Sequence, residues 1–449
     1  MRISVFALYL CVAAFAGGGM AADSPIDENA LFSDTTTLVS AKSLSDTQNV
    51  KDPSEQKGTS IGGNVTVAPI VAGNRDFINH PRLANTSLTD LLVGSVELDA
   101  RLQGATKVFG DFEVDYAPSL DSAQRYSLFL RELFLDFTVN HQAYFSVGKQ
   151  LLQWGRCYFW NPTDLINVEK KPFVDKIGSR EGTLGAKMHV PIGTTYNFYA
   201  FLDLHSATRA DSVALSVKAE YLIGKTEMAL SAWGKRGMPV VLGYDISSRV
   251  AGIDVTGEMS LTAGGDYVPK LELRDSSLYI TTKSSGIVPR ICLDLGRSVS
   301  FMGFPEAMSF NAEAFYNGGG NSGNVFKDST KYIVRAGQFL ALPDAQKPRA
   351  TPQEALLLGN LYEQNYYSKY YAALFLSINR FFASDLSCSL NGIMNIEQRS
   401  GTVSLALGYT LLNNMTFAGT LIGYLGADNT EYTMFGQSFA LQLTAGVRF

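Results

Sequence analysis

The feature that most constrains this chain is a strict alternation of apolar and polar side chains, repeated in segments of about ten residues. Within 92–103, for example, Leu92, Val96 and Leu98 alternate with Glu97 and Asp99. Similar segments follow at 107–116, 127–140, 183–192, 194–204, 213–223, 226–235, 384–396, 402–412, 415–425 and 438–449. Because successive side chains of a strand point to opposite faces, each segment predicts a strand with one apolar face. About ten residues is also what a tilted strand needs to cross a membrane.

These segments predict an all-β fold, a transmembrane antiparallel β-barrel. The chain is 46% hydrophobic, yet after residue 21 it has no apolar run long enough for a membrane helix. In lipid every backbone N–H and C=O must be paired, and a closed sheet leaves no edge unpaired. A soluble β-sandwich of this length would need two or more domains and a linker, but the composition shows no break between 90 and 449.

The connections between the segments predict the strand number and the orientation. Short turns alternate with long loops, as in outer-membrane barrels with short periplasmic turns and long extracellular loops. The longest predicted loops are 153–182, 318–368 and 426–437. If 239–317 holds four strands (239–247, 250–262, 287–297 and 308–317), the count is about 18. The middle of the chain leaves this open: 276–283 is a candidate for a further strand, and about 16 strands remain an alternative.

The two ends of the chain indicate where the barrel resides. Residues 1–21 have the short positive region, apolar run and small–x–small site of a secretory signal peptide. Residues 22–59 are polar and predict a weakly ordered segment before the barrel at 60–449. The last strand, FALQLTAGVRF, resembles the closing strand of outer-membrane barrels, which implies that the barrel-assembly machinery reads Phe449. We therefore expect a multi-pass barrel in contact with the lipid of a bacterial outer membrane.

Several function classes are disfavoured by composition. A formal charge of −5 argues against nucleic-acid binding. Outside the signal peptide only Cys157, Cys292 and Cys388 remain, widely spaced, so we predict no disulfide framework, no metal site and no cofactor. The one histidine with a catalytic setting is His205, beside Ser206 and Asp203. Hydroxyl and acid neighbours are expected in any polar loop, so we predict that the chain is not an enzyme.

The residues that alternate with the lipid-facing ones predict an acidic arc in the lumen of the first strands. Seven of these eight lumen and selectivity candidates are acids: Glu97, Asp99, Arg101, Asp111, Glu113, Asp115, Glu132 and Asp136. Ionised carboxylates need water or counter-charges around them, so the lumen is wet or is partly filled by basic loop residues. The arc is either a solvated polar wall or a selectivity element that favours cations.

The loop 318–368 contains one helix signal. Thr351 supplies a capping oxygen, Pro352 suits the first helical position, and Glu354 lies three residues after the cap. A loop of this size with structure of its own is often functional. This loop either folds into the lumen and narrows it or caps the outer mouth, and we expect it to fold in part into the lumen.

The stretch GKQLLQWGRCYFWNPTDLIN, residues 148–167, concentrates aromatic residues. Trp154 and Trp160 follow a predicted strand and would lie at or above the outer rim, where an interfacial aromatic girdle is one explanation for them. The girdle does not account for Arg156, nor for the turn that Asn161-Pro162-Thr163-Asp164 predicts. The alternative is a loop that folds over the rim, so that Trp154, Arg156 and Asp164 face the mouth or the lumen and can contact solute. Its candidate residues are Trp154, Arg156, Trp160, Asn161 and Asp164.

Two motifs in this chain resemble porin-like outer-membrane barrel families of Gram-negative-type bacteria. The first is G-K-Q, then W-G, then N-P-x-D-L, at Gly148–Gln150, Trp154-Gly155 and Asn161–Leu165. The second is N-A-E-A-F-Y-N-G-G-G, at Asn311–Gly320, a strand that ends in an E-x-F-Y-N-G loop entry. The resemblance covers about thirty residues and implies a channel-type barrel without naming a substrate.

We therefore expect a porin-like channel for passive or weakly selective passage of small hydrophilic solutes. A non-transport surface barrel, either an adhesin or a structural protein, is the alternative, because long outer loops suit both. Homo-oligomerisation stays open because all lipid-facing strands look alike in the sequence.

Overall fold

The computed structural model describes residues 58–74, 85–102, 106–117, 126–174, 177–205, 207–209, 212–281, 285–335, 343–359, 361–382, 385–411 and 414–449. The predicted signal peptide (1–21) and nearly all of the predicted polar segment (22–59) lie outside these residues. Eighteen antiparallel strands form one sheet: β1 (Gly58–Asn74), β2 (Thr86–Arg101), β3 (Lys107–Tyr116), β4 (Tyr126–Val139), β5 (Ala143–Gln150), β6 (Thr183–Ile192), β7 (Tyr196–Asp203), β8 (Ala214–Ile223), β9 (Thr226–Lys235), β10 (Val240–Val250), β11 (Ile253–Ala263), β14 (Ile287–Phe301), β15 (Phe304–Asn317), β18 (Tyr370–Ile378), β19 (Leu386–Asn395), β20 (Ser400–Leu411), β21 (Met415–Leu425) and β22 (Gln437–Arg448).

The sheet closes on itself between its first and last strands. β1 pairs with both β2 and β22, in registers that include Val67↔Leu92 and Val67↔Ala445. The last residue completes the seam, because Phe449 N donates to Gly63 O and Gly63 N donates to Phe449 O, each at 3.0 Å. The predicted barrel and its count of 18 are confirmed, and the 16-stranded alternative is wrong. The candidate strand at 276–283 exists as β13 (Ser277–Thr281), but it belongs to a separate sheet.

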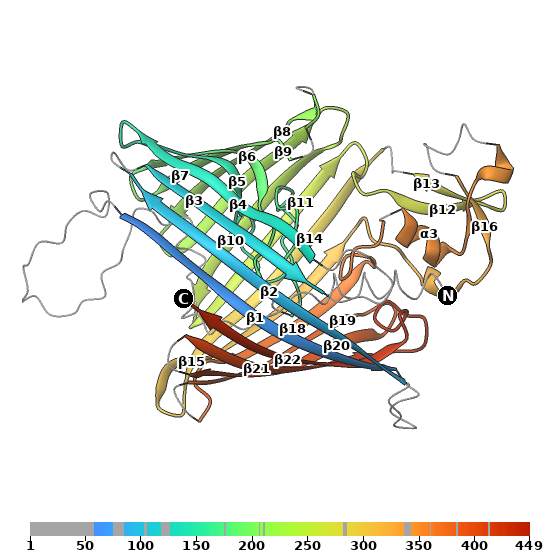
Figure 1. Ribbon diagram of the computed structural model, residues 1–449. Helices are drawn as coiled ribbons and strands as arrows, with labels where there is room; N and C mark the ends of the chain where they lie inside the picture. Colours follow the sequence, from blue (N-terminus) through green and yellow to red (C-terminus); the bar gives the residue numbers. More distant parts are fainter. Residues whose placement is uncertain are drawn as a thin grey trace, which may run out of the picture.

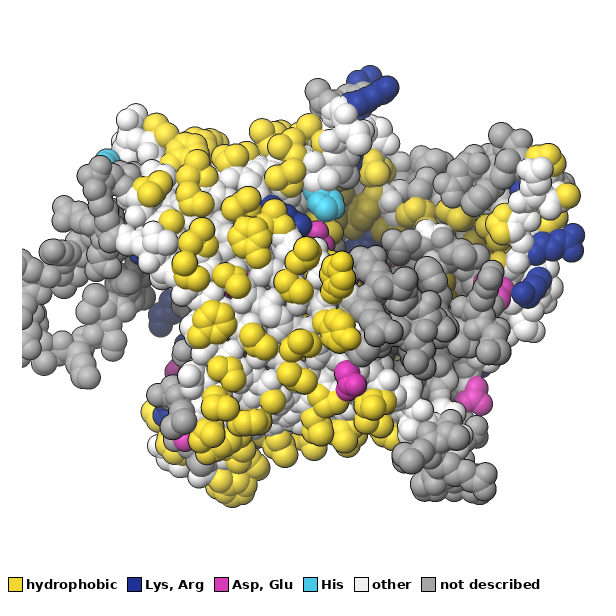
Figure 2. All heavy atoms as spheres, in the orientation of Figure 1, with side chains coloured by type: hydrophobic (Ala, Val, Ile, Leu, Met, Phe, Trp, Pro, Cys, Tyr) yellow, Lys and Arg dark blue, Asp and Glu magenta, His cyan; other side chains and the backbone are white. Residues whose placement is uncertain are grey.

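The outer surface of the barrel is apolar, as Figure 2 shows for one face. Leucine, valine and phenylalanine side chains of alternating strand positions are exposed there, for example Leu88, Leu92 and Val96 on β2. Their neighbours Val93 and Ser95 are buried on the inner side. A continuous outer band of exposed apolar side chains around a closed sheet is what a lipid environment requires. Within the described ranges, no helix is long and apolar enough to cross a membrane.

The two ends of the barrel differ. The turns after β4, β6, β8, β10 and β14 are tight, and the chain terminus lies at the same end (Figure 1). The long connections leave the opposite end. Two of them form a four-stranded sheet beyond the barrel from β12 (Lys270–Arg274), β13, β16 (Tyr332–Arg335) and β17 (Arg349–Ala350).

The predicted helix in the loop 318–368 is confirmed as α3 (Pro352–Leu358). The Thr351 side chain accepts from Glu354 N at 3.1 Å, and the Glu354 carboxylate accepts from Thr351 N at 2.8 Å. The loop divides between two locations. Its part with β16, β17 and α3 joins the outer sheet, whereas Asn365 to Ser368 contact groups inside the barrel mouth.

Candidate functional site

The connection between β5 and β6 runs inside the barrel and is named here the inward loop (residues 151–174 and 177–182). Its contacts follow the strand order around the wall. Trp154 packs against β7, Arg156 N bonds to Glu258 of β11, and Phe159 N bonds to Glu313 of β15. Phe173 then meets β18, Ile177 packs with β1 and β2, and Ser179 N bonds to Glu113 of β3. The expected position at or above the rim is therefore wrong, because partners for the loop lie along the inner wall.

Two buried wall carboxylates hold the backbone of the inward loop. Glu258 accepts from Arg156 N at 2.9 Å, from Thr163 N at 2.7 Å and from Thr163 Oγ1 at 2.7 Å. Glu313 accepts from Phe159 N at 2.8 Å and from Trp160 N at 3.2 Å. Backbone N–H groups are costly to bury without an acceptor, and these two carboxyl groups supply the acceptors. These two side chains are thus the main polar attachment of the loop to the wall.

Arg156 is the ionic centre of the loop. Its guanidinium reaches one carboxylate on each of three neighbouring strands: Glu220 of β8 at 2.9 Å, Glu227 of β9 and Asp245 of β10. Lys218 adds a second cation, 2.9 Å from Glu220 and 3.5 Å from Asp245. The planar fork of arginine suits several carboxylates at once, so Arg156 both neutralises this wall and positions the loop.

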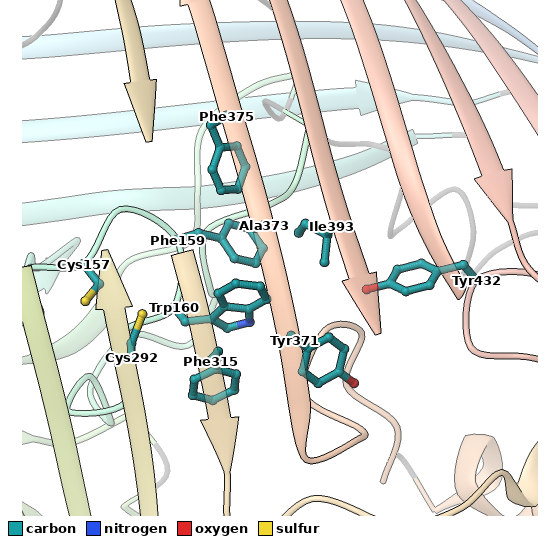
Figure 3. Packing of buried hydrophobic residues seen from close by; sticks show 10 residues of the cluster. All are labelled: Cys157, Phe159, Trp160, Cys292, Phe315, Tyr371, Ala373, Phe375, Ile393 and Tyr432. Carbon is teal, nitrogen blue, oxygen red and sulfur yellow. The ribbon is translucent and has the colours of Figure 1, made fainter. Parts of the chain in front are cut away.

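The two tryptophans anchor the loop at separate places on the wall. Trp160 is fully buried, stacks on Phe315 with centroids 5.3 Å apart, and lies 5.9 Å from Tyr371 (Figure 3). Its Nε1 donates to Asn365 O at 3.1 Å. Trp154 packs with Tyr199 and Phe201 of β7. Both rings point into the barrel, so the girdle interpretation is wrong for them. Trp160, expected to contact solute, has no exposed surface for it.

The predicted turn at 161–164 is confirmed. Asp164 N donates to Asn161 O at 3.0 Å, and the Asp164 carboxylate accepts from Ile166 N at 3.2 Å and from Asn167 N at 3.1 Å. Asp164 therefore fixes the local backbone. Asn161 lies at the same turn and its amide donates to Phe159 O at 3.4 Å.

The predicted acidic arc divides into two groups. Toward the end with the tight turns, Asp99 lies 3.3 Å from Lys107 and 3.6 Å from Arg101, whose side chain is exposed. Asp136 accepts from the Ser146 hydroxyl at 2.5 Å. Glu97, two residues before Asp99 on β2, is half-buried. This group is paired mainly with residues of the wall itself.

The second group meets the inward loop or a buried arginine. Glu113 binds Arg131 Nε at 2.7 Å and also accepts from Ser179 N at 2.7 Å. Glu132 accepts from Leu151 N at 2.6 Å. Asp115 lies 3.8 Å from Arg131, and Asp111 is buried opposite Glu132 in the register of β3 and β4.

Arg131 was missed by simple alternation, which would direct it to lipid. The register shifts between Asp111 and Phe112, opposite Glu132 and Leu130, so one extra residue of β4 stands at a β-bulge. Arg131 is 4% exposed and lies against Glu113. An arginine that faces lipid destabilises a barrel, so the position of Arg131 in the alternation was the one feature of the sequence that indicated a bulge.

The alternation of apolar and polar residues does place other functional residues on the inner side of the wall. Lys218, Glu258 and Glu313 occupy positions that alternate with apolar ones, and Asp245 does so between Tyr244 and Ile246. Alternation predicts which side of the wall these side chains face, but it does not predict which residues of the inward loop they contact. The candidate His205 donates its backbone N–H to Asp203 at 2.9 Å, while Ser206 lies outside the described residues.

Two cavities flank the inward loop. One of about 80 Å³ lies among residues 151–180, and one of about 200 Å³ lies between the turn at 161–164 and the outer connections. They share Asn161, Asp164, Lys170 and Tyr366. The charged residues that the loop contributes to the smaller cavity are Asp164, Lys170, Lys171 and Arg180. The space beside the loop therefore has more basic than acidic groups, unlike the arc on β2 to β4.

A buried carboxylate joins the outer connections to the wall. Glu431, in the connection between β21 and β22, accepts from Asn365 N at 3.0 Å, Tyr371 Oη at 2.9 Å and Asn395 Nδ2 at 2.6 Å. Burial raises the pKa of Glu431 to about 7, against the bonds from Asn395 and Tyr371, which lower it. Folding therefore lets this carboxyl group keep its proton to a higher pH than a free glutamate does.

We expect the wild-type barrel to lose stability as pH rises from 5 to 8. The folded pKa of Glu431 lies above its ordinary value of 4.5, so the folded state binds the proton more tightly. The contribution is fully present below 4.5 and is lost as pH passes about 7, with a size of a few kcal/mol. Urea unfolding from lipid vesicles at several pH values measures it. Glu431→Gln should flatten this dependence; a wild-type stability that rises over the same range contradicts the assignment.

Comparisons with known proteins agree with the barrel. No protein-family model matches the chain, and a search of curated proteins finds no match. Among solved structures, the chain is similar to Acinetobacter baumannii OccAB1 (9% identity, 88% of this chain and 98% of that chain, TM-score 0.50) and OccAB4 (9%, 89% and 100%, 0.50). Pseudomonas aeruginosa OccK8 (OprE) aligns at 8% identity over 87% and 98%, with a TM-score of 0.50. At such identities the likeness establishes the fold.

Proposed function

We propose that this chain is a porin-like channel of the bacterial outer membrane that passes small hydrophilic solutes. The observation that carries the proposal is the inward loop, which follows the inner wall of a closed, lipid-facing barrel and is held by Glu258, Glu313 and Arg156. A loop fixed along the wall narrows a lumen to a defined size. The porin-like motifs at 148–165 and 311–320 support the same function.

The charges beside the loop bear on selectivity. The sequence left the acidic arc as either a solvated polar wall or an element that favours cations. In the structure, Glu113 and Glu132 accept hydrogen bonds from loop amides, and Arg131 pairs with Glu113. The small cavity beside the loop carries Lys170, Lys171 and Arg180 against Asp164. Fixed charges act most strongly on a solute where the passage is narrow, because the Debye screening length is only about 8 Å at physiological salt. We therefore propose that the narrow part favours neutral and anionic solutes, and that the arc sets a weaker cation preference toward the periplasm.

Solute flux into liposomes tests this proposal. Vesicles with the refolded barrel should swell with a small sugar and with a carboxylate of similar size, and should swell more slowly as solute size increases. Replacing Lys171 by glutamine should slow the carboxylate and leave the sugar unchanged. No swelling with any solute, from a barrel of correct heat-modifiable mobility, would favour the surface-barrel alternative, for which the outer sheet of β12, β13, β16 and β17 would be the displayed element.

We also propose that Phe449 serves recognition by the barrel-assembly machinery. Its backbone pairs with Gly63 at the seam, while its side chain is 66% exposed. Homo-oligomerisation remains a proposal of the same kind, because the exposed apolar belt offers many similar surfaces.

A further inference from the structure

Two cysteines that are far apart in the sequence meet inside the barrel. Cys157 belongs to the inward loop and Cys292 to β14 of the wall. Both are free thiols in this structure, and both are buried, with 6% and 1% of their surface exposed. Figure 3 shows the two cysteine side chains close to each other. The sulfurs and a carboxylate oxygen of Glu313 all lie within 4.8 Å of one another.

We infer that Cys157 and Cys292 form a disulfide that fastens the inward loop to the wall. A disulfide has an S–S distance of about 2.05 Å, so the sulfurs must approach by less than about 3 Å. Rotation of two side chains and a small shift of the loop can supply this. The sequence expectation of no disulfide rested on wide spacing and an odd number, and spacing alone does not report which cysteines the fold brings together.

A metal ion is the other chemistry that two thiols and a carboxylate could serve. Structural zinc takes four ligands. Here the Glu313 oxygens already accept the Phe159 and Trp160 amides, and within the described part of the chain the cluster has three members with no histidine. A bound ion would have to take Glu313 away from the loop. A disulfide needs only the two sulfurs and leaves Glu313 in place, so the geometry favours it.

Oxidation of the two thiols requires an electron acceptor, and a protein of the periplasm that carries a reducible disulfide supplies it. The periplasm is the oxidising compartment through which an outer-membrane protein passes. One cysteine thiolate attacks the oxidant's disulfide and forms a mixed disulfide. The second thiolate displaces the oxidant as a dithiol, so two thiols lose two protons and two electrons while the oxidant's disulfide is reduced. Because both sulfurs are buried in the folded barrel, the reaction would take place before the loop docks completely. This inference rests on the proposed outer-membrane location but not on conduction.

Thiol counting on protein extracted from the outer membrane of an expressing Gram-negative host tests the inference. After denaturation without reductant, a maleimide should label one cysteine, Cys388, and label all three mature cysteines after reduction. The unreduced mass should be about 2 Da lower, and peptide mapping should find 157 joined to 292. Cys388 lies on β19 and is the matched control, since Cys388→Ser should abolish the single label and keep the linked peptide.

Two results would overturn it. Three labelled cysteines without reduction would show that the thiols remain free. A metal site would instead be shown if two cysteines resist labelling, a chelator makes them reactive, and the unreduced mass is not about 2 Da lower. Either result leaves the channel proposal intact, because solute flux is measured separately.

Discussion

Replacing Glu258 by alanine is expected to release the first half of the inward loop and to raise single-channel conductance severalfold. Glu258 accepts from Arg156 N, Thr163 N and Thr163 Oγ1, and within the described part of the chain these three donors have no other hydrogen-bond acceptor. A hydrogen bond contributes about 0.5–1.5 kcal/mol of net stability, and a buried donor left unpaired costs about 1–3 kcal/mol, so the docked conformation loses three of the bonds that hold it. A freed loop no longer narrows the lumen and should also increase current noise.

Two variants separate loop release from loss of charge. Asp99→Asn removes one negative charge from the wall at a residue paired with Arg101 and Lys107, away from the loop, and should leave conductance nearly unchanged. Glu258→Gln keeps the shape but offers one acceptor oxygen, so we expect an intermediate conductance. Equal effects of Glu258→Ala and Asp99→Asn would mean that Glu258 acts only through its charge.

Replacing Arg156 by methionine is the second large effect that we expect. The change leaves Glu220, Glu227 and Asp245 with Lys218 as their neighbouring cation, and Asp245 is almost fully buried. Removing one partner of a buried ion pair typically costs about 3–5 kcal/mol. We expect lower unfolding stability in urea and a reversal potential, under a salt gradient, that shifts toward cations.

Arg156→Lys is the matched control for this prediction. It keeps the positive charge, so the reversal potential should return most of the way to the wild-type value. A lysine cannot reach three carboxylates with one planar group, so the loss in stability should be restored only in part. A reversal potential that is the same in the wild type and in Arg156→Met would contradict a position for Arg156 beside the conducting path.

The strands and their inner and outer faces could be predicted from the sequence because alternation is a local signal. Leu92, Val96 and Glu97 reveal their sides of the wall without knowledge of any distant residue. The bulge at Arg131 breaks that rule, and only the cost of a charge in lipid hinted at it. The strand at 277–281 also has a local pattern, but its membership of the outer sheet depends on pairing with β16, far along the chain.

The path of the inward loop could not be predicted in the same way. Its attachments join residues that are far apart in the sequence, such as Arg156 with Glu258 at a separation of 102 and Phe159 with Glu313 at 154. The sequence showed a loop rich in aromatic residues and a wall rich in carboxylates, and the carboxylates were interpreted as either a solvated polar wall or selectivity residues. Much of the inner acidic surface instead accepts hydrogen bonds from the loop backbone.

The most direct test of the central claim is the single-channel conductance of the wild-type barrel in a planar bilayer. We expect discrete, uniform steps, because a loop fixed by Glu258, Glu313 and Arg156 gives a narrow lumen of one defined size. Silence from a folded, heat-modifiable barrel would contradict the account and would mean that the inward loop closes the lumen.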